Sequence, residues 1–284
     1  HSRFAFIDCE ARGLSIRQGG MESCPLTGPF FLAAEGLLGT RTSMFGKINN
    51  AQGENIDYTF HPGNPESKKI VVIGHGVTGN KDRPFVVALA EGLAAAGFNA
   101  LRFSFSGNGD SDGQFVDCTI SKEVSDLGAV LDVLKDYEIC FVGHSMGGAV
   151  GVICASEDDR IKCLISLAGM VNTKKFAETE FGMEEPDKGC MWEEESCPLS
   201  SAFMNDLRDI DSVASRGAQI NVPWLLVHGS EDDVVPIGDS REILAAAGEN
   251  AELNELPGAN HVFAGEHTAP MVSTVNDWLN KHFR

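Results

Sequence analysis

The chain has 284 residues, enough to bury a sizeable core, and its 43% apolar and 22% charged residues are typical of a globular protein. Its 41 acidic residues outnumber 22 basic ones and give a formal net charge of -19, which repels nucleic-acid phosphates and anionic lipid headgroups. We therefore expect neither nucleic acid nor a membrane surface as a partner.

The N-terminal part of the chain and the cysteines carry little functional information. The apolar run PFFLAAEGLL contains Glu35 and has no basic stretch just before it, so it does not fit a secretion signal. The eight cysteines form no C-x-x-C pair and no zinc-ligand spacing, although a disulfide between Cys190 and Cys197 is conceivable. We expect a reduced, cytoplasmic location, and residues 1–43 form an extension without an assigned role.

From Met44 onward, short apolar strands alternate with helices. The segments GKINN and NIDYTF flank AQG and predict an early hairpin. Further strands are expected in KKIVVIG, NALRFSF, EICFVG, IKCLISL, VPWLLVHG and AELNELPG. Helices are expected after Asp82 as the cap, over 121–137, from about Gly147, over 240–247, and at the C-terminus. This alternation predicts a mostly parallel α/β sheet that opens with an antiparallel hairpin.

The stretch between Met170 and Gln219 is too long for an ordinary connection and lacks a clear helical or strand pattern. Because it mixes many carboxylates with large apolar side chains, we expect an inserted cap over the active edge of the sheet. The cap would span 170–219 and divide a core of 44–169 and 220–284. Four of its apolar residues are candidates to line an acyl or alcohol pocket, and plain packing of the cap explains them equally well: Phe181, Met191, Trp192 and Phe203.

The segment GHSMGG places Ser145 between glycines, directly after a predicted strand and before a predicted helix. This is the G-x-S-x-G pattern, in which small residues on both sides allow a strained turn that exposes a serine hydroxyl. The string alone is common by chance, but the strand-turn-helix context favours a nucleophile over a merely structural glycine turn.

A serine nucleophile needs a base and an acid, here expected in the chain order serine, acid, histidine. The loop GSEDDVVP follows a predicted strand and offers Glu231, Asp232 and Asp233 as acids, among which the residues alone do not decide. His261 lies in the loop after the next predicted strand. Both loops fall where open α/β sheets place their ligands, so an exposed loop histidine becomes the weaker interpretation of His261.

An oxyanion hole requires backbone N–H groups that face the developing charge. One donor is expected from the amide of Met146, next to the serine, and the other from Val77 in the glycine-rich loop that follows KKIVVIG.

The same glycine-rich loop supports a competing hypothesis. Residues Gly74 to Gly79 spell G-x-G-x-x-G, the dinucleotide fingerprint, and Arg102 ends the next strand where a phosphate could be bound. Against this hypothesis, no acidic residue ends NALRFSF, and the helix is expected only from Asp82, too far from the third glycine to bind a pyrophosphate. It would also leave Ser145 and His261 unexplained.

Five segments, HGVTGNKD, RFSFSGNGDSDGQF, GHSMGG, HGSEDDVVP and PGANHVF, together resemble the landmarks of the α/β-hydrolase superfamily in their usual order. The resemblance implies an α/β-hydrolase fold, with a mostly parallel eight-stranded sheet, helices on both faces, and a cap between strands 6 and 7. Within its HG-x-x-D-x-V-V-P pattern the acid falls on Asp232, with Asp233 in reserve. The first two segments are similar to those of bacterial carboxylesterases of the cinnamoyl and feruloyl esterase type.

The resemblance implies a serine carboxylesterase that forms an acyl-enzyme on Ser145, with no cofactor and no metal. Feruloyl-type enzymes can hold a phenolic hydroxyl with a cap tyrosine, but Tyr58 and Tyr137 are the only tyrosines and both lie outside 170–219. We therefore expect a general esterase for small to medium acyl esters, with aryl or cinnamoyl-type esters as further candidates. Alternatives are a lipase or monoacylglycerol hydrolase, an amide or peptide hydrolase, the dinucleotide binder and a non-catalytic ligand receptor. The expected partner is a small-molecule ester, and a homodimer is one candidate for the oligomeric state.

Overall fold

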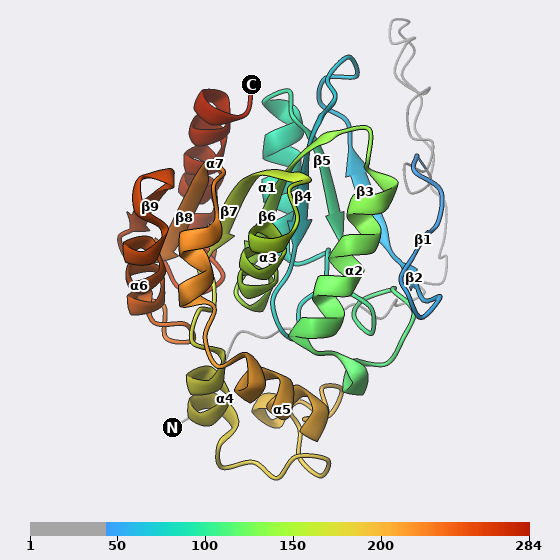
Figure 1. Ribbon diagram of the computed structural model, residues 1–284, viewed down its shortest axis with the longest axis vertical. Coiled ribbons are helices and arrows are strands. Elements are labelled where there is room, and N and C mark those ends of the chain that lie inside the picture. The colour runs from blue at the N-terminus through green and yellow to red at the C-terminus, as the bar shows by residue number, and fades with distance from the viewer. Residues whose placement is uncertain (1–43) are drawn as a thin grey trace, which may run out of the picture. The chain divides into compact units, whose positions relative to one another are not determined.

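A seven-stranded sheet with the order β3-β5-β4-β6-β7-β8-β9 forms the centre of the structure, a computed structural model that describes residues 44–284 (Figure 1). The extension predicted for residues 1–43 lies outside the described residues. β3 runs antiparallel to β5, and the other neighbouring strands pair in parallel. In chain order the strands are β3 (Tyr58–His61), β4 (Lys69–Gly74), β5 (Asn99–Phe103), β6 (Glu138–His144), β7 (Ile161–Leu167), β8 (Trp224–Gly229) and β9 (Ala251–Leu256).

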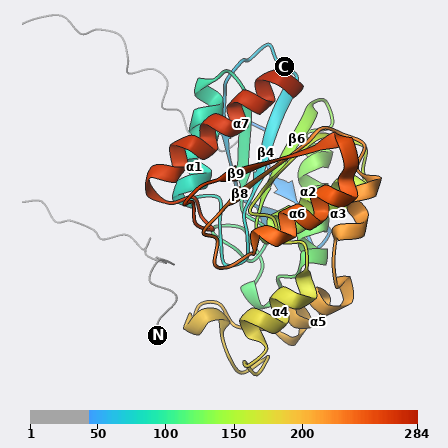
Figure 2. The same cartoon turned by 90° about the vertical axis from the view of Figure 1, so that its left-hand side faces the viewer.

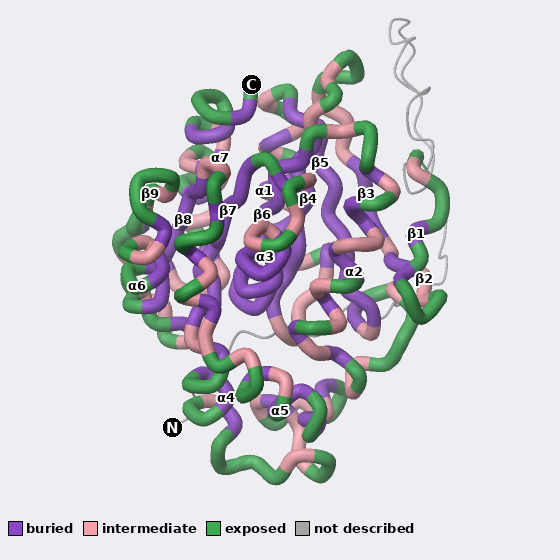
Figure 3. Tube along the Cα trace, in the orientation of Figure 1, coloured by how far each residue is buried: buried purple, intermediate pink, exposed green. Residues whose placement is uncertain are grey.

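Helices cover both faces of this sheet and explain the continuous apolar runs of its central strands. α1 (Pro84–Ala95) and α7 (Thr268–His282) lie on one face, and α2 (Ile120–Val133), α3 (Met146–Glu157) and α6 (Ile237–Ala247) lie on the other (Figure 2). Accordingly, β4 and β6 are buried at every position except their first (Figure 3). The remaining short helices are 3-10 turns at Phe115–Asp117, Met191–Glu193, Ala214–Gln219, Gly248–Asn250 and Gly265–His267.

The number of strands in the sheet differs from the predicted eight. The opening hairpin forms as predicted, but β1 (Ile48–Asn49) and β2 (Asn55–Ile56) make a separate two-stranded sheet. The outer edge of β2 contacts a loop rather than a strand, because the backbone of Asn55 exchanges hydrogen bonds with the side chain and amide of Asp112. The hairpin therefore packs beside the sheet without extending it.

The predicted cap of the first long helix is also wrong. α1 begins after Arg83, with Pro84 in its first turn and no side-chain cap. The carboxylate of Asp82 instead accepts hydrogen bonds from Lys81 and Arg102. Two cations thus hold the side chain that was expected to cap the helix.

The connection between β7 and β8 is more regular than expected, because it contains α4 (Thr173–Phe181) and α5 (Ser201–Ile210). Figures 1 and 2 show both helices together at one end of the sheet. Asp239 of α6 fixes the start of this insertion by accepting hydrogen bonds from the amides of Val171 and Asn172. The hydroxyl of Thr173 donates to the carbonyl of Leu207 and ties α4 to α5.

Candidate active site

Ser145 lies in the sharp turn between β6 and α3, with φ at 53° and ψ at -118°. This conformation is costly for a residue with a side chain and is found where function requires it. The flanking glycines are explained by crowding, because a Cβ atom on Gly143 would lie 2.1 Å from the carbonyl oxygen of Gly147. A Cβ atom on Gly147 would lie 2.4 Å from the carbonyl oxygen of His75. The turn therefore has the geometry that the G-x-S-x-G pattern predicts.

The hydroxyl of Ser145 is buried, and the residue exposes 2% of its surface. Its Oγ atom makes no hydrogen bond with any residue that the structure describes. The glycine-rich loop lies directly against it, since a Cβ atom on Gly76 would come within 2.7 Å of the Ser145 Cβ atom. The expected contact between this hydroxyl and His261 stays a prediction, since hydrogen bonds to a nucleophile often tighten only when substrate binds.

Asp232 and His261 meet at the carboxyl ends of β8 and β9, although they are far apart in the sequence. Nδ1 of His261 lies 2.8 Å from Oδ2 of Asp232 and donates to it. The other carboxylate oxygen, Oδ1, accepts from the amides of Val234 and Val235, each at 2.9 Å. Of the three candidate acids in this loop, Asp232 is therefore the one that orients the imidazole.

The carboxylate of Asp232 is ionised at neutral pH despite its complete burial. Burial alone would raise the pKa of Asp232, because a low-dielectric environment disfavours charge. Hydrogen bonds from the imidazoles of His228 and His261 outweigh this effect and hold its pKa well below the ordinary value. The site thus contains a fixed negative charge next to the ring of His261.

Three buried histidines that the sequence analysis did not single out surround these residues: His75, His144 and His228. His75 directly follows β4, His228 is the penultimate residue of β8, and His144 ends β6 directly before Ser145. Their position at the carboxyl ends of strands, where such sheets bind ligands, is the signal that could have identified them.

His75 holds the glycine-rich loop. Its Nε2 atom accepts from the amide of Phe105 at 3.0 Å, so its proton lies on Nδ1, which donates to the carbonyl of Gly76 at 2.8 Å. Burial lowers the pKa of His75 to about 4, so the ring is neutral at physiological pH. The carbonyl that it binds belongs to the same peptide unit as the Val77 amide.

His144 links the nucleophile turn to the histidine loop. Its Nε2 atom donates to the backbone carbonyl of His261 at 2.9 Å, and the two rings pack with their centroids 4.7 Å apart. Burial, together with the neighbouring His261, lowers the pKa of His144 to about 3. A neutral His144 therefore fixes the backbone of the residue that we expect to act as the base.

The two expected oxyanion donors lie on either side of the serine turn. Met146 is the first residue of α3, so its amide precedes the first hydrogen bond of that helix. The Val77 amide donates no backbone hydrogen bond within residues 44–284. The next residue, Thr78, has a φ of 57°, and its carbonyl accepts from Arg83 at 2.8 Å. The role of the Val77 and Met146 amides as oxyanion donors stays a prediction.

The four candidate pocket residues of the insertion pack against one another. Phe181, Met191 and Phe203 are each at most 2% exposed, and the rings of Phe181 and Trp192 lie 5.0 Å apart. The indole of Trp192 donates to Glu180 at 2.9 Å. This arrangement fits the interpretation as packing, and contact with substrate stays a prediction.

The glycine-rich loop lacks two features that the dinucleotide hypothesis requires. α1 begins only at Pro84, well beyond Gly79. The guanidinium of Arg102 is already occupied, because it donates to His61, to the carbonyl of Lys81 and to Asp82. The loop instead packs against the nucleophile turn.

Other sequence expectations concern metals, disulfides and membranes. In residues 44–284, no group of three or more His, Cys, Asp or Glu side chains is arranged to hold a metal. No disulfide joins Cys190 to Cys197. Within the same range, no helix combines the length and apolar character needed to cross a bilayer.

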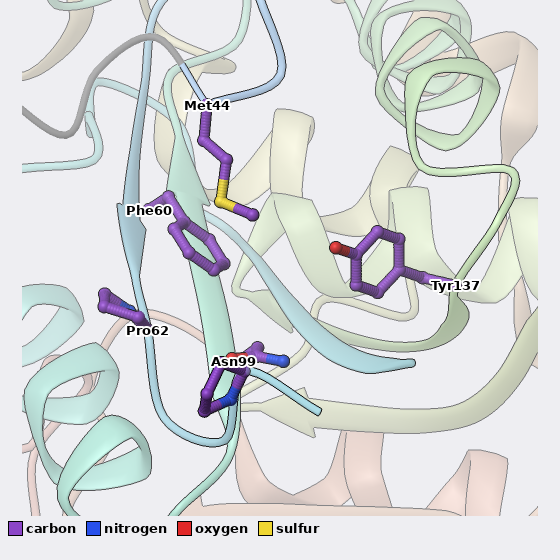
Figure 4. Close-up of a pocket in the computed structure, with 6 residues that line it drawn as sticks. Met44, Phe60, Pro62, Asn99 and Tyr137 are labelled. Atoms are coloured by element: carbon purple, nitrogen blue, oxygen red, sulfur yellow. The ribbon is translucent and has the colours of Figure 1, made fainter. Parts of the chain in front are cut away.

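A cavity of about 230 Å³ lies apart from these residues (Figure 4). Met44, Phe60, Pro62, Pro65, Asn99 and Tyr137 line it. Asn99 begins β5, whereas Ser145 follows the end of β6, so the cavity and the nucleophile turn lie at opposite ends of the sheet.

Comparisons with known proteins identify relatives of this chain. The model of the prolyl oligopeptidase family matches residues 121–284. Human "Palmitoyl-protein thioesterase ABHD10, mitochondrial" is 28% identical over 169 residues, which cover 55% of this chain and 55% of that protein. The chain thus spans about half the length of the curated relatives it matches first. An uncharacterized 31.7 kDa protein of Escherichia coli is 22% identical over 81% of this chain and 96% of its own length.

Solved structures share the fold of this chain. Est1E from Butyrivibrio proteoclasticus, solved with ferulic acid bound, superposes with a TM-score of 0.71 and 26% identity. The superposition covers 83% of this chain and 98% of that one. Mouse α/β-hydrolase domain-containing protein 10 has the same fold, with a TM-score of 0.68 and 19% identity over 83% and 98% of the two chains.

Proposed function

Because this chain belongs to the prolyl oligopeptidase family, within the α/β hydrolases, we propose that it is a serine esterase that cleaves small to medium acyl esters. The observation that carries the proposal is the 2.8 Å contact between Asp232 and His261, which lie at the same end of the sheet as the strained Ser145 turn. These three residue types, in this chain order, are the components of a nucleophile-base-acid relay.

The proposed reaction has two steps. Ser145 attacks the ester carbonyl while Nε2 of His261 takes its proton, and Asp232 orients and stabilises the resulting imidazolium. The amides of Val77 and Met146 hold the oxyanion of the tetrahedral intermediate. The alcohol leaves with a proton from His261, and water then attacks the acyl-serine with His261 again as the base.

The acyl specificity is proposed from the relatives and from the tyrosines. Est1E binds ferulic acid in its solved structure, which supports aryl or cinnamoyl-type esters among the substrates. The hydroxyl of Tyr58 is already used, because it accepts from the amide of Phe45 and donates to the carbonyl of Gly46. Tyr137 lines the cavity at the opposite end of the sheet. Neither tyrosine is placed to hold a phenolic substrate, and we therefore propose a general esterase.

Acyl thioesters are the second proposed substrate class. The observation that favours them is the 28% identity to a protein named as a palmitoyl-protein thioesterase. Thioester hydrolysis passes through the same acyl-serine and needs the same oxyanion donors. A thiolate leaves more readily than an alkoxide, so the site needs no additional acid for this reaction.

The insertion of residues 170–219 is proposed to act as a cap over the active site. Its helices α4 and α5 lie together at one end of the sheet, and Asp239 anchors its first residues to α6. A cap in this position would exclude water while the acyl-serine forms.

The experiment is a panel of p-nitrophenyl esters of increasing chain length, aryl cinnamates and acyl thioesters, assayed with the wild type and Ser145→Ala. Loss of the nucleophile is expected to lower kcat by roughly 10⁶-fold on every substrate that the wild type cleaves. A fluorophosphonate probe should label the wild type and not the variant. Near-normal hydrolysis by Ser145→Ala would remove Ser145 from its proposed role, and a wild type that is neither active nor labelled would refute the esterase proposal.

A further inference from the structure

Asp232 contacts a second imidazole in addition to that of His261. His228, in β8, is fully buried, and its Nε2 atom lies 3.2 Å from Oδ2 of Asp232 and 2.9 Å from the carbonyl oxygen of Val235. Both neighbours are acceptors, so Nε2 carries a proton and donates to them. Oδ2 of Asp232 therefore accepts from His261 on one side and from His228 on the other.

The imidazole of His228 is held at its other nitrogen as well. Nδ1 lies 2.8 Å from the hydroxyl of Ser240, a fully buried residue of α6. A ring that is bonded at both nitrogens and enclosed on all sides has a single orientation. The hydrogen-bonded chain thus runs from Ser240 through His228 and Asp232 to His261.

His228 also closes the loop that carries the acid. The amide of Val235 donates to Oδ1 of Asp232, and the carbonyl of the same residue accepts from His228. The loop is therefore held through both its side chain and its backbone. Because the Asp232 side chain is 0% exposed, water cannot replace a donor that is lost from this arrangement.

We propose that His228 is a positioning residue of the catalytic machinery, which aims Asp232 at His261 while Ser240 fixes the imidazole of His228. The inference rests on the proposed function, in which Asp232 orients the base. A purely structural role, in which His228 only fills space beneath the loop, is the alternative. The two differ in their effect on the pH dependence of the reaction.

The direction of the pH effect follows from the forces on Asp232. Burial raises the pKa of this carboxyl, and the bonds from His228 and His261 lower it. Removal of the His228 donor therefore raises the pKa of Asp232, so that this carboxylate takes up a proton at a higher pH than in the wild type. A carboxylate that has lost one donor is more basic and stabilises positive charge on the adjoining imidazole more strongly. The acid limb of the kcat/KM profile, which reports the base that Asp232 orients, should therefore also move to higher pH.

The test compares His228→Leu, which loses the donor, with His228→Gln, whose amide Nε2 can reach the same position and donate. On a p-nitrophenyl ester we expect His228→Leu to lower kcat by about 10- to 100-fold with a smaller change in KM, as for the loss of a hydrogen bond to a charged group. Its acid limb should move to higher pH. His228→Gln should stay within a few-fold of the wild type and keep the wild-type acid limb. His282→Gln, at the end of α7, serves as the matched histidine control.

The proposal is overturned if His228→Leu and His228→Gln lose activity equally, or if the acid limb stays in place in the leucine variant. A wild type that cleaves no ester of the panel would refute the proposed substrates alone, and the rate of fluorophosphonate labelling then replaces kcat as the readout. If labelling also fails, the crystal structure of His228→Leu decides. A contact kept at 2.8 Å between Asp232 and His261 would contradict the proposal, and a broken contact would support it.

Discussion

At the scale of single residues, the candidate site is organised by buried imidazoles that bind backbone and carboxylate acceptors. His75 fixes a carbonyl of the glycine-rich loop, His144 fixes the backbone of His261, and His228 binds Asp232. Sequence patterns predicted Ser145 and the acid loop because those residues follow strands in a recognisable order. They did not predict the three histidines, because each acts on an atom that is distant in sequence or belongs to the backbone.

Alanine substitutions at two glycines should have opposite effects on the free energy of unfolding, because one glycine lies in the crowded nucleophile turn and the other faces open space. In Gly147→Ala the new Cβ atom would lie 2.4 Å from the carbonyl oxygen of His75, an overlap that backbone movement alone can relieve. We expect a loss of about 1–3 kcal/mol in unfolding free energy, measured by urea denaturation, and slower labelling of Ser145.

Gly128→Ala is the matched control for this substitution. Gly128 lies inside α2, and a Cβ atom there would meet no neighbour within 4 Å. We expect a gain of about 0.5–1 kcal/mol in unfolding free energy, because alanine restricts the unfolded chain more than glycine does. Equal effects of the two substitutions would contradict the packing of the turn.

At the scale of elements, the insertion shows where sequence patterns stop being informative. α5 carries signals that are visible in retrospect, because Ser200 caps it and Phe203 and Leu207 are spaced for one face. α4 has only nine residues, several of them charged, and such a short helix depends on tertiary packing rather than on propensity. The capping role expected for Asp82 was wrong for a related reason, since Lys81 and Arg102 compete for its carboxylate.

The junction between α2 and α5 contains a buried acid that should limit stability. Glu123 is 2% exposed, and its Oε2 atom has no hydrogen-bond partner among residues 44–284. Burial raises the pKa of Glu123 well above its ordinary value, and the nearby carboxylates of Asp126 and Asp206 add to this shift. The carboxylate of Asp126 accepts a hydrogen bond from the side chain of Asn50. The carboxylate of Asp206 accepts one from the hydroxyl of Ser121, across the junction.

The raised pKa of Glu123 predicts a stabilising substitution. Above the ordinary pKa of 4.5 the unfolded chain releases the proton while the folded chain keeps it, so the wild type loses stability as pH rises towards the folded pKa. Glu123→Gln removes this loss, and its advantage should be absent below about pH 4 and grow towards neutrality. Urea unfolding of both proteins across this range measures it, and parallel curves for wild type and variant would refute it.

At the scale of the whole molecule, the predicted α/β-hydrolase fold and superfamily membership are confirmed by the family match and by the superposition with Est1E. Both were predictable because a buried parallel sheet requires apolar strands, and because its reactive residues follow those strands in order. The strand number was not predictable, because whether the hairpin joins the sheet depends on its contact with the loop at Asp112.

The net charge of the molecule predicts its preference among esters. A formal charge of -19 gives a negative potential around the protein. The insertion adds exposed carboxylates at the end of the sheet where the nucleophile turn lies. These carboxylates are Glu178, Glu184, Glu185, Asp187, Glu193, Glu195, Asp209 and Asp211. An ester that bears a carboxylate should therefore show a lower kcat/KM than a neutral ester of equal size, since repulsion slows its approach.

Salt distinguishes this repulsion from a difference in fit. The screening length falls from about 30 Å at 0.01 M to about 10 Å at 0.1 M, so added salt should narrow the gap between the two esters. The double substitution Glu184→Gln and Glu185→Gln should narrow the difference in kcat/KM between the two esters at low salt. Glu91→Gln on α1, outside the insertion, should change this difference less. A gap that neither salt nor the double substitution alters would show that the shape of the site, rather than the field of the molecule, selects between the esters.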